Sequence, residues 1–190
     1  MFERPHHQKI AQILHTMDAD LLTHAKCYFG GGTAIALKLG EYRESVDINF
    51  LCSDLVGYRL LREAITPPTL GAVLRAPIKH LREVRTQRDK ISTFLEVDGT
   101  AVRVKFVLEG RIAITGALDP KLSVPVLCRE DMYAEKLLAN ADRALDRSQM
   151  SRDLIDLAMM IQAWGPSPRP RWKRRKAPMA GPSRTISIAD

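Results

Sequence analysis

The chain has 190 residues, of which 45% are hydrophobic and 27% are charged. This is the size of one ordinary domain with a short appendix, and the composition excludes a collagen-like or wholly disordered protein. No run of 18 apolar residues occurs, which excludes a membrane-spanning helix. The three cysteines, Cys27, Cys52 and Cys128, are widely spaced and odd in number, so we expect a reducing, cytoplasmic location without a disulfide framework.

The net charge of +7 is concentrated in one segment. Residues 165–190 contain seven Lys or Arg and a single acid, Asp190, so six of the seven positive charges lie there. This segment also holds five of the eleven prolines, and we predict an irregular basic tail. Three interpretations stay open: a solvated appendix, an arm that binds RNA phosphates through residues 171–176, and a shift of the coding frame near residue 166.

Hydrophobic periodicity predicts short helices and strands in a mixed order over residues 1–116. A glycine turn follows the first strand, Gly40 is placed to end the next helix, and Asp98-Gly99 is a hairpin turn between two later strands. The expected elements are helices over 9–16, 21–25, 34–39 and 57–64, and strands over 27–29, 46–51, 93–97, 101–108 and 112–114.

A helical portion follows, over residues 117–164, with helix expected from Arg129 onward. Two apolar stripes at helical spacing are expected to face the core. The sequence therefore predicts an α+β fold in three parts: an α/β core at 1–116, this helical portion, and the basic tail at 165–190. The stripes are Tyr133, Leu137 and Leu138 in the first helix, and Leu154, Leu157, Ala158 and Ile161 in the second.

Three consecutive glycines, residues 30–32, separate the first strand from the helix at 34–39. Glycine lets the backbone approach a ligand closely, and the N-terminus of the following helix attracts an anion. Thr33 adds a hydroxyl. The same residues also make an ordinary tight turn, so this feature alone leaves a phosphate site and a structural turn both open.

Asp47 and Asn49 lie two positions apart in the strand at 46–51 and therefore share one face. The alternation predicts that Val46, Ile48 and Phe50 face the core. Two oxygen-bearing side chains beside a glycine turn suit Mg²⁺ bound to nucleotide phosphates. The alternative is simply the polar face of an amphipathic strand.

Four segments together resemble one protein family. Residues 29–37, FGGGTAIAL, and 45–50, SVDINF, resemble the first motifs of the DNA-polymerase-β-like nucleotidyltransferases. Residues 131–139, DMYAEKLLA, and 151–157, SRDLIDL, resemble the third and fourth motifs of the AbiEii/AbiGii-type nucleotidyltransferase toxins. The motifs occur in the order that the family has, and they span most of the expected folded part.

The resemblance implies a fold and an activity. The fold would be an α+β nucleotidyltransferase-like mixed sheet with flanking helices. The activity would be metal-dependent transfer of a nucleoside monophosphate from an NTP to an acceptor such as tRNA, with Mg²⁺ or Mn²⁺ as cofactor. Such a protein would be a cytoplasmic toxin of a bacterial toxin–antitoxin system, with a cognate antitoxin as partner and no membrane association.

The resemblance also implies roles for individual residues. The glycine turn would hold the triphosphate, and the aspartate of the second motif would bind the metal. From the residues alone, Arg152, Asp153 and Asp156 are equally a surface ion cluster on one helix. The implied residues are Asp47, Lys136 and Asp153 for catalysis; Gly31, Gly32, Thr33, Ser45, Lys136 and Arg152 for nucleotide binding; and Asp47, Asn49 and Glu109 for the metal.

Two metal positions depart from the family pattern. Asn49 stands where the family has Asp, and an amide oxygen brings no negative charge. The strand at 101–108, which should supply a third carboxylate, contains no acid, so Glu109 just beyond it is the candidate and Glu96 on the preceding strand is a weaker one. Lys105 would bring a positive charge there. Two hypotheses follow: a working nucleotidyltransferase, or a degenerate relative that binds nucleotide, RNA or an antitoxin without turnover.

Overall fold

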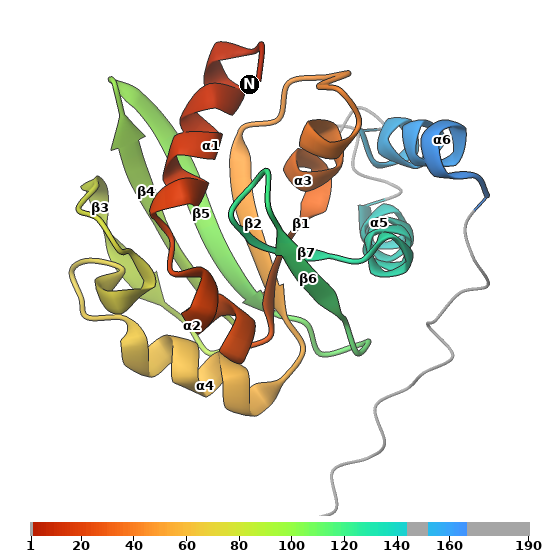
Figure 1. The fold of residues 1–190 in the computed structure, drawn as a ribbon. Coiled ribbons are helices and arrows are strands. Elements are labelled where there is room, and N and C mark those ends of the chain that lie inside the picture. Colours follow the sequence, from red (N-terminus) through yellow and green to blue (C-terminus); the bar gives the residue numbers. More distant parts are fainter. Residues whose placement is uncertain (1, 144–151, 167–190) are drawn as a thin grey trace, which may run out of the picture.

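The computed structural model describes residues 2–143 and 152–166; the expectations for the basic tail beyond residue 166 lie outside this range. A seven-stranded mixed sheet has the order β3-β4-β5-β2-β1-β7-β6 (Figure 1). The α+β fold class is therefore confirmed. The strands are β1 Cys27–Gly30, β2 Asp47–Cys52, β3 Lys79–Thr86, β4 Lys90–Val97, β5 Thr100–Leu108, β6 Gly116–Asp119 and β7 Val124–Leu127.

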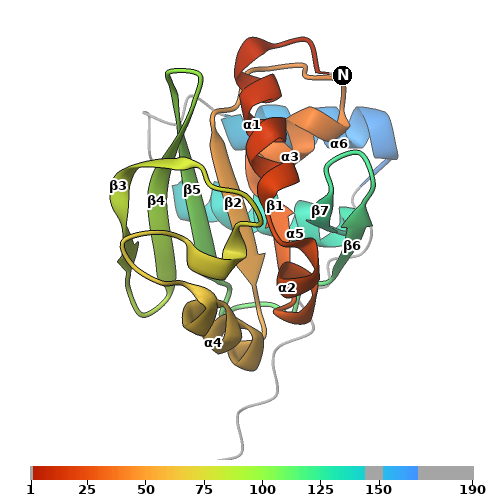
Figure 2. The same cartoon turned by 60° about the vertical axis from the view of Figure 1, so that its left-hand side comes forward.

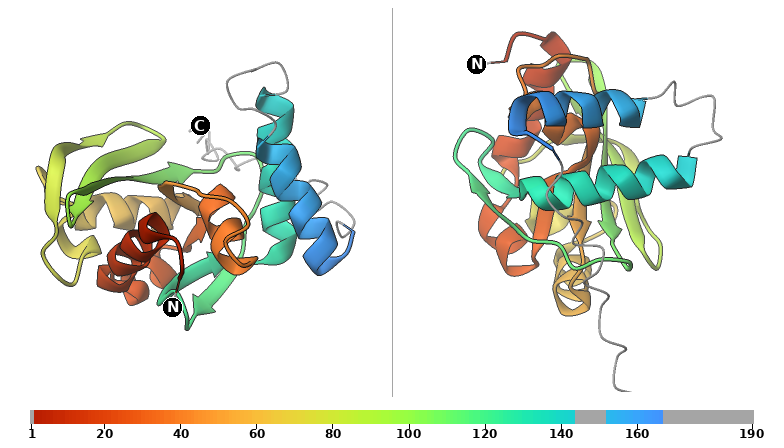
Figure 3. Two further views of the ribbon diagram at one scale, coloured as in Figure 1. Left: turned by 90° about the horizontal axis from the view of Figure 1, so that it is seen from above. Right: turned by 90° about the vertical axis from the view of Figure 1, so that its right-hand side faces the viewer.

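The helices are arranged on both sides of the sheet, with α1 and α2 on one face and α5 and α6 behind it (Figure 2). Helix α3 packs against β1, β2, α5 and α6. Helices α5 and α6 run antiparallel, one beside the other (Figure 3). The helices are α1 Pro5–Thr16, α2 Ala19–His24, α3 Gly31–Lys38, α4 Leu55–Ala64, α5 Arg129–Arg143 and α6 Arg152–Trp164, with a 3₁₀ turn at Gly71–Val73.

The centre of the sheet fixes the register of the strands that matter for function. β2 is antiparallel to β1 and parallel to β5. Alternate residues of β2 point to opposite faces, and Ile48 and Phe50 are fully buried while Asp47 and Asn49 are half-buried on the other face. The Phe50 ring packs between those of Phe29 and Phe106, with centroid distances of 5.6 and 5.2 Å. The strand predicted at 46–51 is confirmed, except that Val46 precedes it and is exposed.

Several other expectations are confirmed. The β4–β5 hairpin turns at Asp98 and Gly99, both with positive φ, as two-residue hairpin loops require. Gly40 follows helix α3 with a φ of +76°, the backbone conformation that ends many helices. Among the described residues, no helix is both long enough and apolar enough to cross a membrane.

Three parts of the chain differ from expectation. Residues 112–114 form a loop, whereas β3, β6 and β7 were not predicted. The segment after residue 115 begins with β6 and β7, which belong to the sheet, and helix begins at Arg129, as expected. The division of the chain at residue 116 stays a prediction. The apolar stripe predicted for α6 is correct only in part, since Leu157 packs against the core but Leu154 and Ile161 are about half exposed. Asp153, Asp156 and Met160 are buried instead. The buried ion pairs of Asp153 and Asp156 determine which face of this helix lies against the core.

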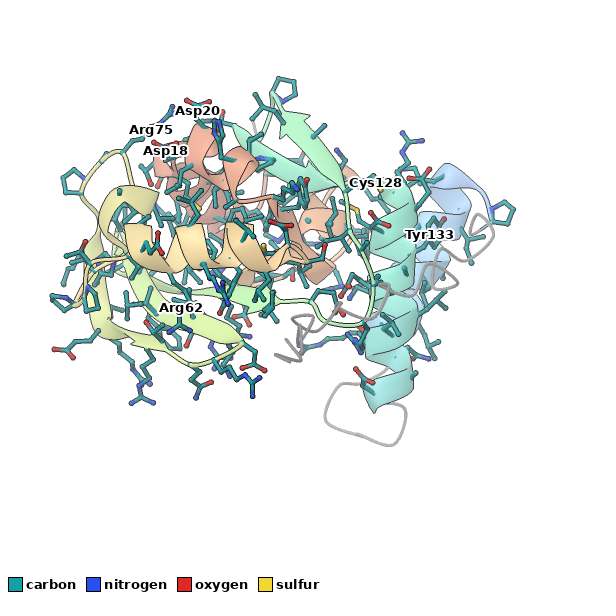
Figure 4. The ribbon with its side chains drawn as sticks, turned by 90° about the horizontal axis from the view of Figure 1, so that it is seen from below. Asp18, Asp20, Arg62, Arg75, Cys128 and Tyr133 are labelled. Atoms are coloured by element: carbon teal, nitrogen blue, oxygen red, sulfur yellow. The ribbon has the colours of Figure 1, made fainter. Side chains whose placement is uncertain are left out.

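Side-chain caps and ion pairs fix the helices at the lower edge of the sheet. Asp18 accepts a hydrogen bond from the Leu21 amide at the start of α2 and pairs with Arg75, which also contacts Asp20 (Figure 4). The amide and the guanidinium lower the pKa of Asp18. Arg75 thus ties the segment after the 3₁₀ turn to helix α2.

Helix α4 approaches the chain before β1 so closely that only glycine fits at one position. Asp54 caps this helix by accepting a hydrogen bond from the Gly57 amide. A Cβ atom on Gly57 would collide with the backbone carbonyl of Ala25. Backbone cannot move aside as a flexible side chain can, so the helix would have to shift.

We expect Gly57→Ala to lower the free energy of unfolding by about 2 kcal/mol, the cost of overpacking a fixed contact. Gly110→Ala is the matched control, because a Cβ there meets no atom within 4 Å, and it should change stability by less than about 0.5 kcal/mol. Denaturant unfolding measures both. Equal unfolding midpoints for the two variants would show that α4 does not depend on this contact.

Candidate functional site

A cleft of about 450 Å³ opens where the N-terminal ends of α3 and β2 meet α5 and α6. The sequence placed most of its candidate residues in four separate motifs, and the fold brings eight of them to this one cleft. The lining residues are Gly32, Thr33, Arg43, Glu44, Ser45, Val46, Asp47, Asn49, Lys136, Arg152 and Asp153.

The glycine turn delivers the start of α3 to the cleft. Gly31 has a φ of +73°, a conformation that favours glycine, and a Cβ there would lie 3.4 Å from the side-chain nitrogen Nδ2 of Asn49. A Cβ on Gly32 would collide with the Arg43 guanidinium. The first amides of a helix have no partner within the helix and favour an anion. The turn therefore presents backbone donors beside Asn49.

Two hydroxyl groups hold the start of β2. Thr33 Oγ1 is buried and donates to the backbone carbonyl of Asp47 at 2.5 Å, and Ser45 Oγ lies 2.7 Å from the same hydroxyl. Because the Thr33 proton is used on Asp47, Ser45 is the donor in the second bond. In this structure Thr33 positions Asp47, and phosphate contacts by Thr33 and Ser45 stay predictions.

His7 supports this loop from the opposite side. Its Nε2 accepts a hydrogen bond from the Ser45 amide at 3.0 Å, and its Nδ1 lies 2.8 Å from a carboxylate oxygen of Glu41. A neutral ring with its proton on Nδ1 satisfies both contacts. Sequence patterns assign His7 no role, because its partners Glu41 and Ser45 lie more than thirty residues away along the chain.

Positive charge surrounds Asp47. In the parallel pairing of β2 with β5, Asp47 lies opposite Arg103 and Asn49 lies opposite Lys105. Lys105 Nζ donates to Asp47 Oδ2 at 3.0 Å, and Arg103 Nη1 lies 3.9 Å from the same oxygen. The positive charge expected from Lys105 is therefore present beside the aspartate.

The donor set does not fit the divalent-metal site that the family pattern implies. Divalent hard cations prefer several oxygen ligands, with carboxylates supplying the charge. Here one carboxylate, Asp47, and one neutral amide, Asn49, face two basic side chains. Within residues 2–143 and 152–166, no group of three His, Cys, Asp or Glu side chains could hold a metal ion.

Glu109 does not complete this set, and its placement beside Asp47 is corrected. The Glu109 amide donates to the carbonyl of Cys52, at the far end of β2. Five residues of extended strand separate Cys52 from Asp47, a span of about 16 Å. The buried Glu109 carboxylate instead accepts bonds from the Arg111 backbone amide and guanidinium at 2.5 and 3.0 Å.

A second carboxyl group adjoins Glu109. Burial, together with the negative charge of Glu109, raises the pKa of Glu135 to about 8. Arg111 lowers the pKa of Glu109 despite its burial. This cluster holds the loop after β5 against α5, which is a structural task away from the cleft.

A buried ion network forms the helical wall of the cleft. Lys136 Nζ lies 2.9 Å from Asp153 Oδ1 and 2.5 Å from Asp156 Oδ2. Arg43 Nε and Nη2 donate to the two oxygens of Asp156 at 2.7 and 2.8 Å, and Tyr42 donates to Oδ1. Two cations thus meet two carboxylates, so the network is electrically balanced.

This network joins three distant segments: the loop before β2, α5 and α6. Burial tends to raise the pKa of Asp156, but the hydrogen bonds and charges of Arg43 and Lys136 outweigh it and lower the pKa. Burial and Asp156 raise the pKa of Tyr42. The sequence indicated Lys136, Asp153 and Asp156, but it gave no sign of Tyr42 and Arg43, which are more than 110 residues from their partner.

Comparison with known proteins identifies relatives of this fold. A family model described as "Nucleotidyl transferase AbiEii toxin, Type IV TA system" matches residues 13–181. A search of curated proteins found no match. Among solved structures, a protein of H. pylori described as a nucleotidyltransferase superposes with a TM-score of 0.52 at 15% identity, covering 83% of this chain and 68% of that chain. At this identity the likeness shows the fold.

A second solved structure is a nucleotidyltransferase-like antigenic protein from Paracoccidioides brasiliensis. It matches with a TM-score of 0.49 at 16% identity, covering 83% of this chain and 75% of that chain.

We expect Asp156→Asn to lower the free energy of unfolding at pH 7 by about 3 kcal/mol, because it leaves two buried cations short of a carboxylate. The folded-state pKa of Asp156 lies below its usual value of 3.8. Its stabilising effect is therefore present above that value and is lost as pH falls through the folded-state pKa. Chemical unfolding between pH 7 and pH 2.5 should show the two proteins converging at low pH.

Asp142→Asn is the matched control, because Asp142 pairs with Arg111 but is largely exposed. It should cost less than about 1 kcal/mol. An Asp156→Asn variant as stable as this control at pH 7 would show that the network does not hold the helical wall.

Proposed function

The chain belongs to the AbiEii nucleotidyl transferase toxin family, and from this premise we propose that its cleft binds an NTP and transfers the nucleoside monophosphate to an acceptor such as tRNA. In this proposal the protein acts in the bacterial cytoplasm as the toxin of a toxin–antitoxin pair, opposed by a cognate antitoxin. The observation that carries the proposal is the convergence of the glycine turn, Asp47 and Arg152 on one cleft.

Each part of the cleft suits one part of the reaction. The amides of Gly31 and Gly32 at the start of α3 suit the negative phosphates, and the exposed side chain of Arg152 faces them from α6. In the transfer, an acceptor oxygen bonds to the α-phosphorus and pyrophosphate leaves. Positioning and charge stabilisation supply most of the catalysis in such reactions.

Asp47 is the proposed catalytic residue. Its carboxylate lies at the start of β2, and the bonds from Thr33 and Lys105 fix its position. A carboxylate in this place can accept the proton that the attacking hydroxyl loses. Lys136 and Asp153 act through the network that shapes the helical wall, and their direct contact with substrate stays a prediction.

A second candidate function is binding without turnover. Asn49 in place of a carboxylate and the ion pair between Lys105 and Asp47 favour it. In this alternative the same cleft binds a nucleotide, an RNA or the antitoxin, and the reaction does not proceed. Catalysis by Asp47 is what separates the two.

The test incubates the purified protein with each α-labelled NTP, Mg²⁺ or Mn²⁺, and total tRNA. We expect label on the RNA, and Asp47→Ala should reduce it by about 100-fold or more, the loss typical of removing one main source of transition-state stabilisation. Asp98→Asn is the control, because that carboxylate is exposed at the β4–β5 turn and asparagine tolerates the positive φ of this position, and it should label RNA as the unchanged protein does.

Label that persists in Asp47→Ala would contradict the proposed role of this residue. If the unchanged protein leaves RNA and protein unlabelled while Asn49→Asp labels them, the protein is a relative weakened at one position. If neither labels anything, binding without turnover becomes the function.

A further inference from the structure

Two basic side chains occupy the strand that carries the third carboxylate in the family pattern. Lys105 and Arg103 project from β5 on the same face as Asp47 and Asn49, as the register of β2 and β5 requires. Both reach the same oxygen of Asp47, at 3.0 and 3.9 Å. A divalent cation at Asp47 would therefore have to approach a carboxylate that two cations already neutralise.

The remaining charges leave this corner of the cleft positive. Lys136 and Arg43 are balanced by Asp153 and Asp156 in the buried network. Asp47 is the carboxylate that pairs with Lys105 and Arg103, whose side chains are 24% and 44% exposed and can reach an anion. Such an arrangement attracts phosphate groups rather than a metal ion.

The basic surface continues from Lys105 across the open face of the sheet. A hollow of about 210 Å³ lies there, and its lining from β3, β4 and β5 includes five basic side chains and one acidic residue, Glu83. The guanidiniums of Arg82 and Arg103 lie 4.9 and 5.3 Å from the Phe94 ring centroid, so stacking on one ring orients both. The basic residues of this hollow are Arg82, Arg85, Lys90, Arg103 and Lys105.

We propose that Lys105, assisted by Arg103, binds the phosphate groups of the nucleotide directly, so that the cleft holds a nucleoside triphosphate without a divalent cation. This inference rests on the proposed function, since it concerns the same nucleotide in the same cleft. It assigns Lys105 the charge neutralisation that the family pattern gives to a metal ion. Magnesium bound to the free triphosphate would then compete with Lys105, because it removes negative charge from the ligand.

Isothermal titration of the full chain with ATP, GTP, CTP, UTP and inorganic tripolyphosphate, in EDTA and in Mg²⁺, tests the proposal. We expect at least one of these ligands to bind in EDTA with an affinity equal to or greater than in Mg²⁺. Lys105→Met should weaken binding in EDTA by about tenfold, the loss expected for one charge-assisted hydrogen bond. Lys26→Met is the matched control, because Lys26 is exposed just before β1, next to the opposite end of β2, and it should bind as the unchanged protein does.

We expect a double variant to reverse the effect of Mg²⁺ on nucleotide binding. Asn49→Asp with Lys105→Asp places three carboxylates on the cleft face, and binding should then require Mg²⁺. Thermal unfolding confirms that each variant is folded.

Binding that needs Mg²⁺ in the unchanged protein, or that Lys105→Met leaves intact in EDTA, would overturn the inference while leaving the proposed function standing. No binding of any nucleotide in either condition would overturn the proposed function itself.

Discussion

The parallel pairing of β2 with β5 is the constraint on which the rest of the site depends. It sets Asp47 opposite Arg103 and Asn49 opposite Lys105, so the charges of β5 decide what the carboxylate of β2 can bind. The antiparallel pairing of β2 with β1 then brings Gly30 opposite Asn49, which places the glycine turn at the same edge. Three strands thus gather the backbone amides of the glycine turn and the carboxylate of Asp47 at one cleft, with Lys105 and Arg103 at its border with the basic hollow, and the Phe50 ring on the opposite face anchors β2 to the core.

The helical wall of the cleft is stable because each buried carboxylate in it is paired with a positively charged side chain. An uncompensated buried carboxylate would be costly, but Asp156 receives bonds from both Arg43 and Tyr42 and pairs with Lys136. Satisfying these groups turns α6 so that Asp153 and Asp156 face inward, while Leu154, Ile155 and Ile161 are about half exposed. Loss of this network would therefore alter the cleft as well as the stability, because the loop that carries Arg43 leads directly to Ser45 and Asp47.

The sequence predicted the elements whose local pattern is strong. Alternation placed Asp47 and Asn49 together on one face, and the Asp98-Gly99 turn defined a hairpin. It did not predict β3, whose residues are mostly charged and exposed, or β6 and β7, which have four residues each. The prediction for Glu109 was wrong because β5 pairs with β2 in parallel, so the residue after the end of β5 lies near the end of β2 and not near Asp47. The register of strand pairing cannot be read from one sequence. The burial of Asp153 and Asp156 in α6 was not predicted for a similar reason, because their partners are distant in sequence.

The two departures from the family pattern are physically coupled. Asn49 and Lys105 face each other across β2 and β5, so a carboxylate at position 49 would meet the Lys105 ammonium before it met a metal ion. A neutral amide there avoids drawing Lys105 away from Asp47, and Lys105 in turn supplies the positive charge that a poorly held metal would not. The residues at positions 49 and 105 therefore both bear on the same carboxylate, that of Asp47. If Lys105 binds the phosphates as proposed, the two departures act as one change, in which a lysine side chain replaces a bound metal ion as the source of positive charge.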